Sequence, residues 1–425
     1  MSEADDASAP AIDAGRVLAD LADLAALTGG PGGARRICWT AEWATARDLL
    51  RERLAGIGVE EVETDEAGNL WARLPGADPD ASALALGSHL DSVPAGGPLD
   101  GALGVMAALG VLRAWAGDPE GRRPPRDLVL IDFADEEGAR FGRSLFGSSA
   151  LAGTLDPTAL ADLTDAGGER IGDVLAASGV DLGAAPRAHE RIGAIGTYLE
   201  LHIEQGPVLD AEGESCAAVS GCAGVERFRV ELTGQASHAG TTPMDRRRDC
   251  GLAAAEIALE VERIARQRGG VGTTGSLDLD PGVVTAVAGH ATLSVDLRHP
   301  DAGELAEMLA ATRRAAGEVA GRRGCEMAEH PIWRIEPIPF DPDLVAAAES
   351  AVAAAGGRRE PIASGALHDA AEMARVVPAA MIFASSERGI SHAADERSAA
   401  GDLRAAIAAF GALAGAVLQA PPRPS

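Results

Sequence analysis

Residues 84–105 read LALGSHLDSVPAGGPLDGALGV, and this stretch decides both the fold and the chemistry of the chain. The short apolar run at its start predicts a strand that delivers His89 and Asp91. A turn rich in proline and glycine follows, and Asp100 then stands just before a predicted helix at 102–115. An imidazole and a carboxylate therefore lie where open α/β sheets place their chemistry. The stretch predicts the first half of a metal site.

Composition excludes several classes of protein. A length of 425 residues favours two domains over one. The chain has 37 basic and 64 acidic residues, and its net charge of -27 argues against nucleic acid or an anionic membrane as a partner, since phosphate binding needs a basic face. All the basic residues are arginine, which excludes a lysine Schiff base and a P-loop.

Cysteine usage and the ends of the chain favour a cytoplasmic protein. Five cysteines without a CxxC pair leave no complete set of disulfides. The acidic start, MSEADDASAP, predicts a disordered lead-in rather than a signal peptide, and PPRPS predicts a frayed end. The longest apolar run, 405–418, is too short for a membrane span and predicts a buried helix.

Further predicted strands also end in side chains that bind metals. Residues 127–133, DLVLIDF, form a continuous apolar strand of the kind buried in parallel sheets, and three adjacent carboxylates follow it. These carboxylates would repel one another and lose hydration if buried, so a cation would compensate them. Two more strands are predicted at 198–203 and 379–383. The metal-capable residues at the ends of the predicted strands, or just beyond them, are His89, Glu136 with Glu137, His202 and His392.

The pattern changes between about Ala217 and Cys325. It predicts strand, helix, strand and helix in turn, at 226–232, 250–266, 291–297 and 303–319. This order favours a small α+β sandwich inserted into a larger α/β domain. We expect a catalytic domain formed by 1–215 and 331–425, and an insertion at 216–330 that covers, or pairs above, the metal crevice.

Seven blocks of sequence together resemble one family. They are GSHLDSVPAGGPLDGALGV, DEEGARF with FGSSALAG, LHIEQGPVL, GQASHAGTTPM, VDLRH, SGALHDA and GISHAADE, which span about Gly87 to Glu396. In content and order they resemble the bacterial zinc-dependent hydantoinase/carbamoylase amidases, which include N-carbamoyl-L-amino-acid hydrolases, ureidopropionases and allantoate amidohydrolases. The resemblance implies a di-metal peptidase-like domain with a mixed, mostly parallel sheet, and an inserted dimerisation or lid domain.

The same resemblance implies two divalent metal ions per subunit, bridged by Asp100. His89 and His202 would be the other ligands of one ion, and Glu137 and His392 the other ligands of the second. Mixed imidazole and carboxylate ligands suit zinc, and manganese, cobalt or nickel could occupy the same set. Peptidases and aminoacylases of the wider clan generally have a carboxylate where this chain has His202, so this residue favours the ureido-hydrolysing branch.

Two catalytic roles follow from the resemblance. Glu136 corresponds to the general base, because the family's ligand is the glutamate directly before glycine, here Glu137. Asp91, two residues after His89, would orient that imidazole. His238 resembles the residue that polarises the scissile carbonyl, often from the partner subunit of a dimer.

The residues expected to bind the substrate come from several blocks. Arg298 resembles the residue that binds the substrate carboxylate. Its planar guanidinium group can donate two parallel hydrogen bonds to a carboxylate. An ion pair with Asp296 or Asp301 is the alternative role of this arginine. Gln205 would line the same pocket.

Two departures from the family affect this pocket. An asparagine usual in an NVVPG-like stretch is replaced by Thr285, and in the block usually written SGAGHDA Leu367 replaces the second glycine. Gly365 of the same block is a further candidate for binding the substrate. His368 would either line the pocket or support the metal loop. A missing amide and an added side chain alter the carboxylate end of the pocket, so the substrate need not be allantoate or a plain carbamoyl amino acid.

The sequence therefore predicts a homodimeric metalloamidase that cleaves a linear ureido or amide C–N bond in a small molecule. The main alternative is an aminoacylase or dipeptidase of the same clan. A non-catalytic binding protein on this scaffold is a second alternative, disfavoured because the base and all five ligands are present. A serine hydrolase is disfavoured because no GxSxG elbow occurs.

Overall fold

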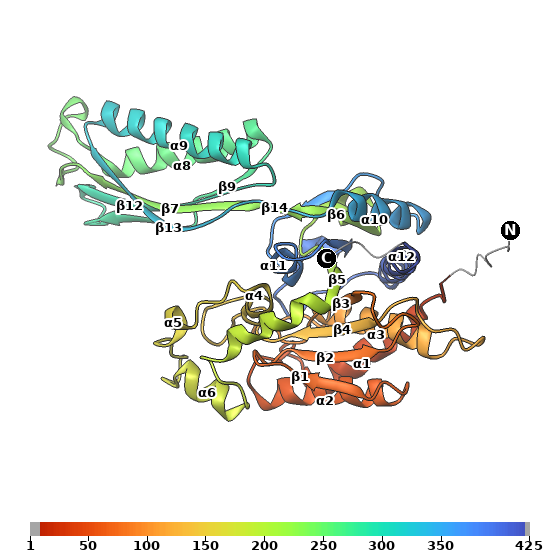
Figure 1. Ribbon diagram of the computed structural model, residues 1–425. Helices are drawn as coiled ribbons and strands as arrows, with labels where there is room; N and C mark the ends of the chain where they lie inside the picture. Colours follow the sequence, from red (N-terminus) through yellow and green to blue (C-terminus); the bar gives the residue numbers. More distant parts are fainter. Residues whose placement is uncertain (1–8, 421–425) are drawn as a thin grey trace. The chain divides into compact units, whose positions relative to one another are not determined.

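The computed structural model describes residues 9–420, which form two compact units (Figure 1). Unit 2 consists of Gly221–Pro339 and Ala363–Leu367, and the rest of the described chain is unit 1. Most of the expected lead-in and the whole expected frayed end lie outside the described residues. Unit 2 extends beyond the expected boundary at 330, because strand β13 (Glu326–Ile335) crosses it. The catalytic and dimerisation roles of the two units stay predictions.

Unit 1 is built on a mixed sheet whose central strands are parallel. The pairs β3–β4, β3–β5 and β5–β16 are parallel, and the outer pairs are antiparallel. Every residue of β3, β4 and β16 is buried, which explains their continuous apolar sequences. The predicted mixed α/β fold is confirmed. In spatial order the strands are β1 (Glu61–Thr64), β2 (Leu70–Leu74), β4 (Leu128–Phe133), β3 (Ala83–His89), β5 (Ile195–Ile203), β16 (Ala379–Ala384) and β6 (Cys216–Cys222).

Helices cover this sheet and share one apolar core with it. Figure 1 shows α10 and α12 side by side, and α12 also contacts β16. Asp13 and Thr40 cap the first two helices through their side chains. The longer helices are α1 (Ala14–Thr28), α2 (Ala41–Ala55), α3 (Ala102–Ala116), α10 (Pro342–Ala354) and α12 (Ala400–Gln419); short ones are α4 (Phe146–Ala152), α5 (Pro157–Leu160), α6 (Ile171–Ala177), η1 (Ala185–Ala194), α7 (Val208–Glu212), α11 (Asp369–Met373) and η3 (Glu387–Gly389).

Helix α12 is longer than the apolar run that predicted it. The sequence indicated a segment too short for a membrane span, but α12 has 20 residues and is long and apolar enough to cross a membrane. The polar first turn, which includes Asp402, extends the helix beyond the run. Leu403, Phe410 and Leu413 are buried in the core of unit 1, so α12 is a core helix as expected.

A buried ion pair joins α2 to the central sheet beside the first metal-capable loop. Arg47 Nε donates to Asp132 Oδ2 at 2.6 Å, and Asp132 Oδ1 accepts from the amide of Leu90 at 2.8 Å. Removing one partner of such a pair costs about 3–5 kcal/mol, because the other charge is left buried. We therefore expect Arg47→Met to lower the free energy of unfolding by about that amount in urea titrations.

The same helix carries a matched control. Arg51 faces Asp48 at 3.4 Å, and both side chains are largely exposed. Arg51→Met should change the free energy of unfolding by less than about 1 kcal/mol. Equal losses in the two variants would show that burial does not set the contribution of Arg47.

Unit 2 is an antiparallel sheet with two helices on one face. Figure 1 shows α8 (Cys250–Arg268) and α9 (Ala302–Arg323) side by side on this sheet. Buried and half-buried residues alternate along β12, as the sequence predicted for a strand covered on one face. The strands run β10 (Leu277–Asp280), β12 (His290–His299), β7 (Gly224–Thr233) and β13, with β9 (Val271–Thr273) also on β12.

The expected strand and helix order of unit 2 omitted its shorter or more exposed elements. Strand β13 is mostly exposed and lacks regular alternation, so periodicity did not reveal it. Short strands escape the same test because they contain too few residues. These are β8 (Ser237–His238), β9, β10, β11 (Ala286–Val287) and β14 (Ile338–Pro339). The short helix η2 (Met244–Arg246) follows β8, and β15 (Ile362–Ser364) lies at the boundary of the two units.

Candidate metal centre

Among the described residues, three groups of side chains could hold a metal ion; one is Glu200, His202 and His368, and the other two share Asp100 and contain five side chains from separate parts of unit 1. His89, Asp100 and His202 make up one group, and Asp100, Glu137 and His392 the other. Within each group the possible ligand atoms lie within 4.8 Å of one another. Asp100 Oδ1 lies 3.2 Å from His202 Nε2, and Oδ2 lies 3.1 Å from His392 Nε2. Asp100 thus presents one oxygen to each group.

The parallel strands explain why these side chains meet. His89 ends β3 and His202 is the penultimate residue of β5, and the carboxyl ends of parallel strands share one edge of a sheet. Gly101 follows Asp100 with φ 63°, and a Cβ there would lie 2.4 Å from the His89 ring. Only glycine lets the chain turn so close to the imidazole.

Three other residues around the centre have a strained backbone. Asp135, Gln205 and His392 have φ of 56°, 56° and 55°, in the left-handed region that residues with a Cβ rarely adopt. Such conformations persist only where the surrounding structure imposes them, and they concentrate at functional sites. The strain supports a functional role for this edge of the sheet.

The electrostatics of the cluster suit cations. Burial raises the pKa of Asp135 to about 8 and that of Glu137 to about 7. Burial also opposes ionisation of Asp100, but hydrogen bonds with His202 and His392 hold its pKa well below the usual value. A hydrogen bond with Asp100 raises the pKa of His392 to about 9. The cluster combines oxygen and imidazole donors that are buried except at half-buried Glu137 and exposed His392, and its carboxylates need nearby positive charge to ionise, so this donor set fits divalent metal ions.

Glu136 lies beside the first group without belonging to it. Its Oε2 is 3.6 Å from His89 Nε2, and the side chain is almost fully buried. Burial raises the pKa of Glu136 well above its usual value, against the attraction of His89. A carboxyl group with a raised pKa next to a metal centre is suited to general acid and base chemistry.

Asp91 connects these elements through its carboxylate. Asp91 accepts hydrogen bonds from the amides of Glu136 at 3.2 Å and Glu137 at 3.1 Å. Its Oδ1 is also 3.5 Å from His89 Nδ1. One side chain therefore positions both the imidazole and the peptide that carries the expected base.

Two of the residues expected to bind substrate lie at the metal centre. Gln205 Nε2 donates to Asp100 Oδ2 at 3.0 Å and to Ser391 Oγ at 3.2 Å. The His368 ring lies 4.4 Å from the His202 ring, and burial holds its pKa well below the usual value. His368 therefore packs against the ring of His202, and both roles considered for it, lining the pocket and supporting the metal loop, stay predictions.

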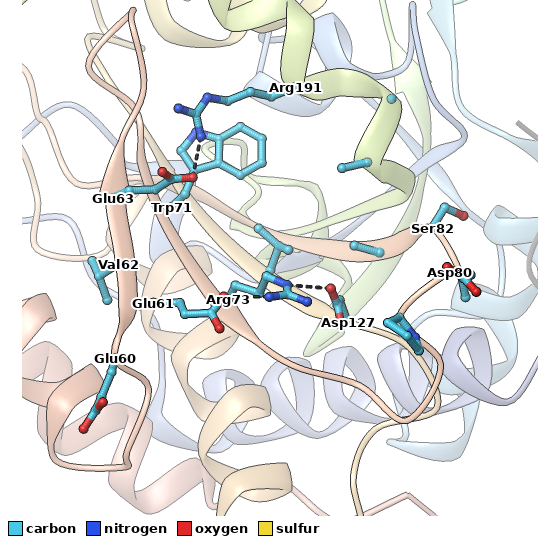
Figure 2. A pocket seen from close by; sticks show the side chains of 16 residues that line it. Glu60, Glu61, Val62, Glu63, Trp71, Arg73, Asp80, Ser82, Asp127 and Arg191 are labelled. Carbon is cyan, nitrogen blue, oxygen red and sulfur yellow. Dashed lines mark hydrogen bonds and ion pairs between the residues drawn. The ribbon is translucent and has the colours of Figure 1, made fainter.

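The cavity in Figure 2 is a different feature of unit 1. It has a volume of about 950 Å³ and is lined by Trp71, Arg73, Asp127 and Arg191 among others. Arg73 donates to both Glu61 and Asp127 at 2.6 Å. The cavity opens near the amino ends of β3 and β4, whereas the ligand residues follow the carboxyl ends. The candidate active site is therefore the cluster, not this cavity.

Comparison with known proteins identifies the family. The sequence profile of Peptidase family M20/M25/M40 matches residues 85–416. This chain belongs to that family. It is 37% identical to the N-carbamoyl-L-amino acid amidohydrolase of Geobacillus stearothermophilus, over 86% of this chain and 89% of that protein. It is 35% identical to the allantoate amidohydrolase of Escherichia coli K12, over 88% and 90% of the two chains.

A solved structure agrees with these relatives. The crystal structure of a hydantoinase/carbamoylase family amidase from Burkholderia ambifaria has a TM-score of 0.85 and 36% identity, covering 95% of this chain and 96% of that one. The resemblance to hydantoinase/carbamoylase amidases drawn from the sequence is confirmed.

Unit 2 of this M20 family member brings together two pairs of expected site residues. Ala286 pairs with His238 across β11 and β8, and the amide of Ala239 donates to Thr285 O at 2.9 Å. Arg298 Nη1 donates to Gly365 O at 2.6 Å, two residues before Leu367. Arg298 also pairs with Asp296 at 2.8 Å, the ion pair considered as its alternative role.

Some residues at the centre had no role assigned from sequence. Glu396 Oε1 accepts from the amides of Leu99 at 3.0 Å and Asp100 at 3.2 Å, and Oε2 accepts from Ser391 Oγ at 2.8 Å. Glu396 thus links the loop of Asp100 to the loop of His392. Its block, GISHAADE, was recognised, but a carboxylate that binds backbone amides has no spacing rule that would single it out.

Proposed function

We propose that this protein hydrolyses a linear ureido or amide C–N bond in a small molecule, using two divalent metal ions. The observation that carries the proposal is Asp100 shared between two groups of ligands, with buried Glu136 beside them. The named activities of the two amidohydrolase relatives support ureido compounds over peptides. His202, which stands where other clan members generally have a carboxylate, supports the same choice.

The proposed ligands divide between the two groups. His89, His202 and one oxygen of Asp100 would hold one ion, and Glu137, His392 and the other oxygen would hold the second. Bound there, the ions would supply Lewis-acid chemistry, acidifying water and polarising the scissile carbonyl. We propose zinc, with manganese, cobalt or nickel as alternatives for the same donors.

Glu136 performs the proton transfers in this proposal. Its carboxylate takes a proton from the attacking water and, because burial raises its pKa, keeps that proton until the leaving nitrogen accepts it. Asp91 fixes the Glu136 peptide during both steps. His238 would polarise the carbonyl, and Arg298 and Gln205 would orient the substrate.

Ammonia release tests the proposal. The metal-reconstituted protein would be assayed with N-carbamoyl amino acids, ureidopropionate, allantoate and ureidoglycolate, and amine release would be followed with N-acetyl amino acids and dipeptides. Ammonia from a ureido compound supports the proposal. Amine release from the acyl or peptide substrates alone would favour an aminoacylase or dipeptidase, and binding without turnover would favour a binding protein.

Thr285 and Leu367 should set substrate preference. We expect the double substitution Thr285→Asn and Leu367→Gly to raise kcat/KM for ordinary N-carbamoyl amino acids, because it adds an amide donor and removes bulk. The ratio of kcat/KM for two substrates would be compared in the wild type, both single variants and the double variant. An unchanged ratio would mean that these residues do not line the pocket.

We also propose a cytoplasmic homodimer that forms through unit 2. Exposed leucines on α8 and β10 support this surface: Leu252, Leu259, Leu277 and Leu279 are 42%, 66%, 40% and 43% exposed. Leu259→Glu should convert a dimer into a monomer in light scattering. Leu27, 53% exposed on α1 of unit 1, supplies the control, and Leu27→Glu should leave the mass unchanged. If the Leu259→Glu variant still has the mass of a dimer, the proposed interface through unit 2 is wrong.

A further inference from the structure

Two thiols of unit 2 face each other at the start of α8 and just after the end of α9. Cys250 is the first residue of α8, and Cys325 follows α9 just before β13. Their Sγ atoms are 3.7 Å apart, although the residues lie far apart in the sequence. Both residues are buried, Cys250 completely, whereas Cys325 keeps 9% exposure.

We propose that Cys250 and Cys325 are a redox site that forms a reversible disulfide when the protein meets a peroxide. Bonded sulfur atoms lie about 2.0 Å apart, so the two Sγ atoms must approach by about 1.7 Å. In this proposal the two side chains rotate to close that distance. Cys250 Sγ would then leave its present contact with Gly289 O, which is 3.3 Å away.

The surroundings set the order of the reaction. Burial, followed by the contact with Cys325, raises the pKa of Cys250 to about 12, so this thiol stays protonated. Thiolates are the reactive form of cysteine, and access also limits the reaction. Cys325, the more exposed of the two, therefore reacts first with the peroxide.

The chemistry balances with one peroxide for each disulfide. Cys325 sulfur attacks one oxygen of hydrogen peroxide, the O–O bond breaks, and water leaves with a sulfenic acid formed on Cys325. Cys250 sulfur then attacks the sulfur of Cys325, the S–O bond breaks, and hydroxide leaves as water with the Cys250 thiol proton. The two thiols lose two electrons in total, and the peroxide is reduced to two waters.

The site adjoins the ribbon that carries His238. The amide of Cys250 donates to Ala288 O at 3.0 Å, and Gly289 O also accepts from the amide of Gly234 at 2.7 Å. Residues 286–287 pair with β8, which contains His238. A disulfide would tie the start of α8, next to this ribbon, to the start of β13. Closing a long loop should raise Tm, because the cross-link restricts the unfolded chain.

Thiol counting on the full-length protein tests the proposal. After treatment with hydrogen peroxide, titration in denaturant should fall from five thiols per chain to three. Peptide mapping should give a Cys250–Cys325 cross-linked peptide that is lighter by two hydrogens, and dithiothreitol should restore all five thiols and the lower Tm. Cys216→Ser, at another buried cysteine, should still lose two thiols, whereas Cys325→Ser should form no cross-link.

Three results would overturn the proposal. They are retention of five thiols, recovery of Cys325 as a sulfinic acid without a cross-link, and a disulfide that joins either cysteine to another residue or another chain. Mapping uses the wild-type protein, so a folding defect in Cys325→Ser would not weaken the test.

Discussion

Glu136→Gln is expected to lower kcat by about 10²–10⁴-fold while metal binding is kept. Glutamine keeps the size of the side chain but cannot take or return a proton at the buried position 3.6 Å from His89. Glu136 belongs to none of the metal-capable groups in the described part of the chain, so its loss should leave their donors intact. Ammonia release and metal content per chain would be measured on the same preparation.

The neighbouring glutamate is the matched control. Glu137 belongs to the second group, with Asp100 and His392, so Glu137→Gln should lose metal as well as activity. The two substitutions are at adjacent positions, and each removes the same single negative charge. If Glu136→Gln loses metal, or if Glu137→Gln keeps both ions, the roles assigned to these residues are wrong.

Asp100→Asn is expected to have the largest effect on the metal centre. Its two oxygens face His202 and His392 at 3.2 and 3.1 Å, so one substitution removes charge from both groups. Changes around metal ligands typically lower affinity by about 10–100-fold, and loss of a shared ligand should exceed that range. We expect fewer than two ions per chain after dialysis, and turnover should fall in parallel.

An exposed aspartate separates the effect of the site from that of overall charge. Asp162, whose side chain is 99% exposed and pairs with Arg170, would be replaced by asparagine as the control. Asp162→Asn should retain wild-type metal content and turnover. Two tightly bound ions in Asp100→Asn would show that Asp100 does not bridge the two groups.

The electrostatics of the centre favour cations over a purely structural network. Asp135, Glu136 and Glu137 are consecutive, and burial raises the pKa of all three. Ionisation of such a cluster is unfavourable without positive charge. Asp91 binds the amides of Glu136 and Glu137 and holds these carboxyl groups together despite that cost. The fold therefore gathers carboxyl groups whose ionised forms need a nearby positive charge, which a cation would supply.

The sequence by itself determined the four buried central strands of unit 1, β3, β4, β5 and β16, and the metal-capable residues at or just beyond their ends, whereas β6 (Cys216–Cys222) was expected in the insertion. A continuous apolar run such as 128–133 predicts a buried parallel strand because both faces are covered, and this signal is local. The blocks around His89, Glu137, His202 and His392 were recognisable because their residues are close in sequence. The family followed from those blocks, and the comparisons agree with it.

Only the tertiary structure decided which atoms meet. Asp100 presents separate oxygens to His202 and His392, Glu396 joins the loops of Asp100 and Ser391, and Cys250 faces Cys325. These contacts depend on strand order, on the register of β3 with β5, and on backbone turns such as Gly101. No local pattern records them, because they arise when packing of distant segments sets side-chain directions.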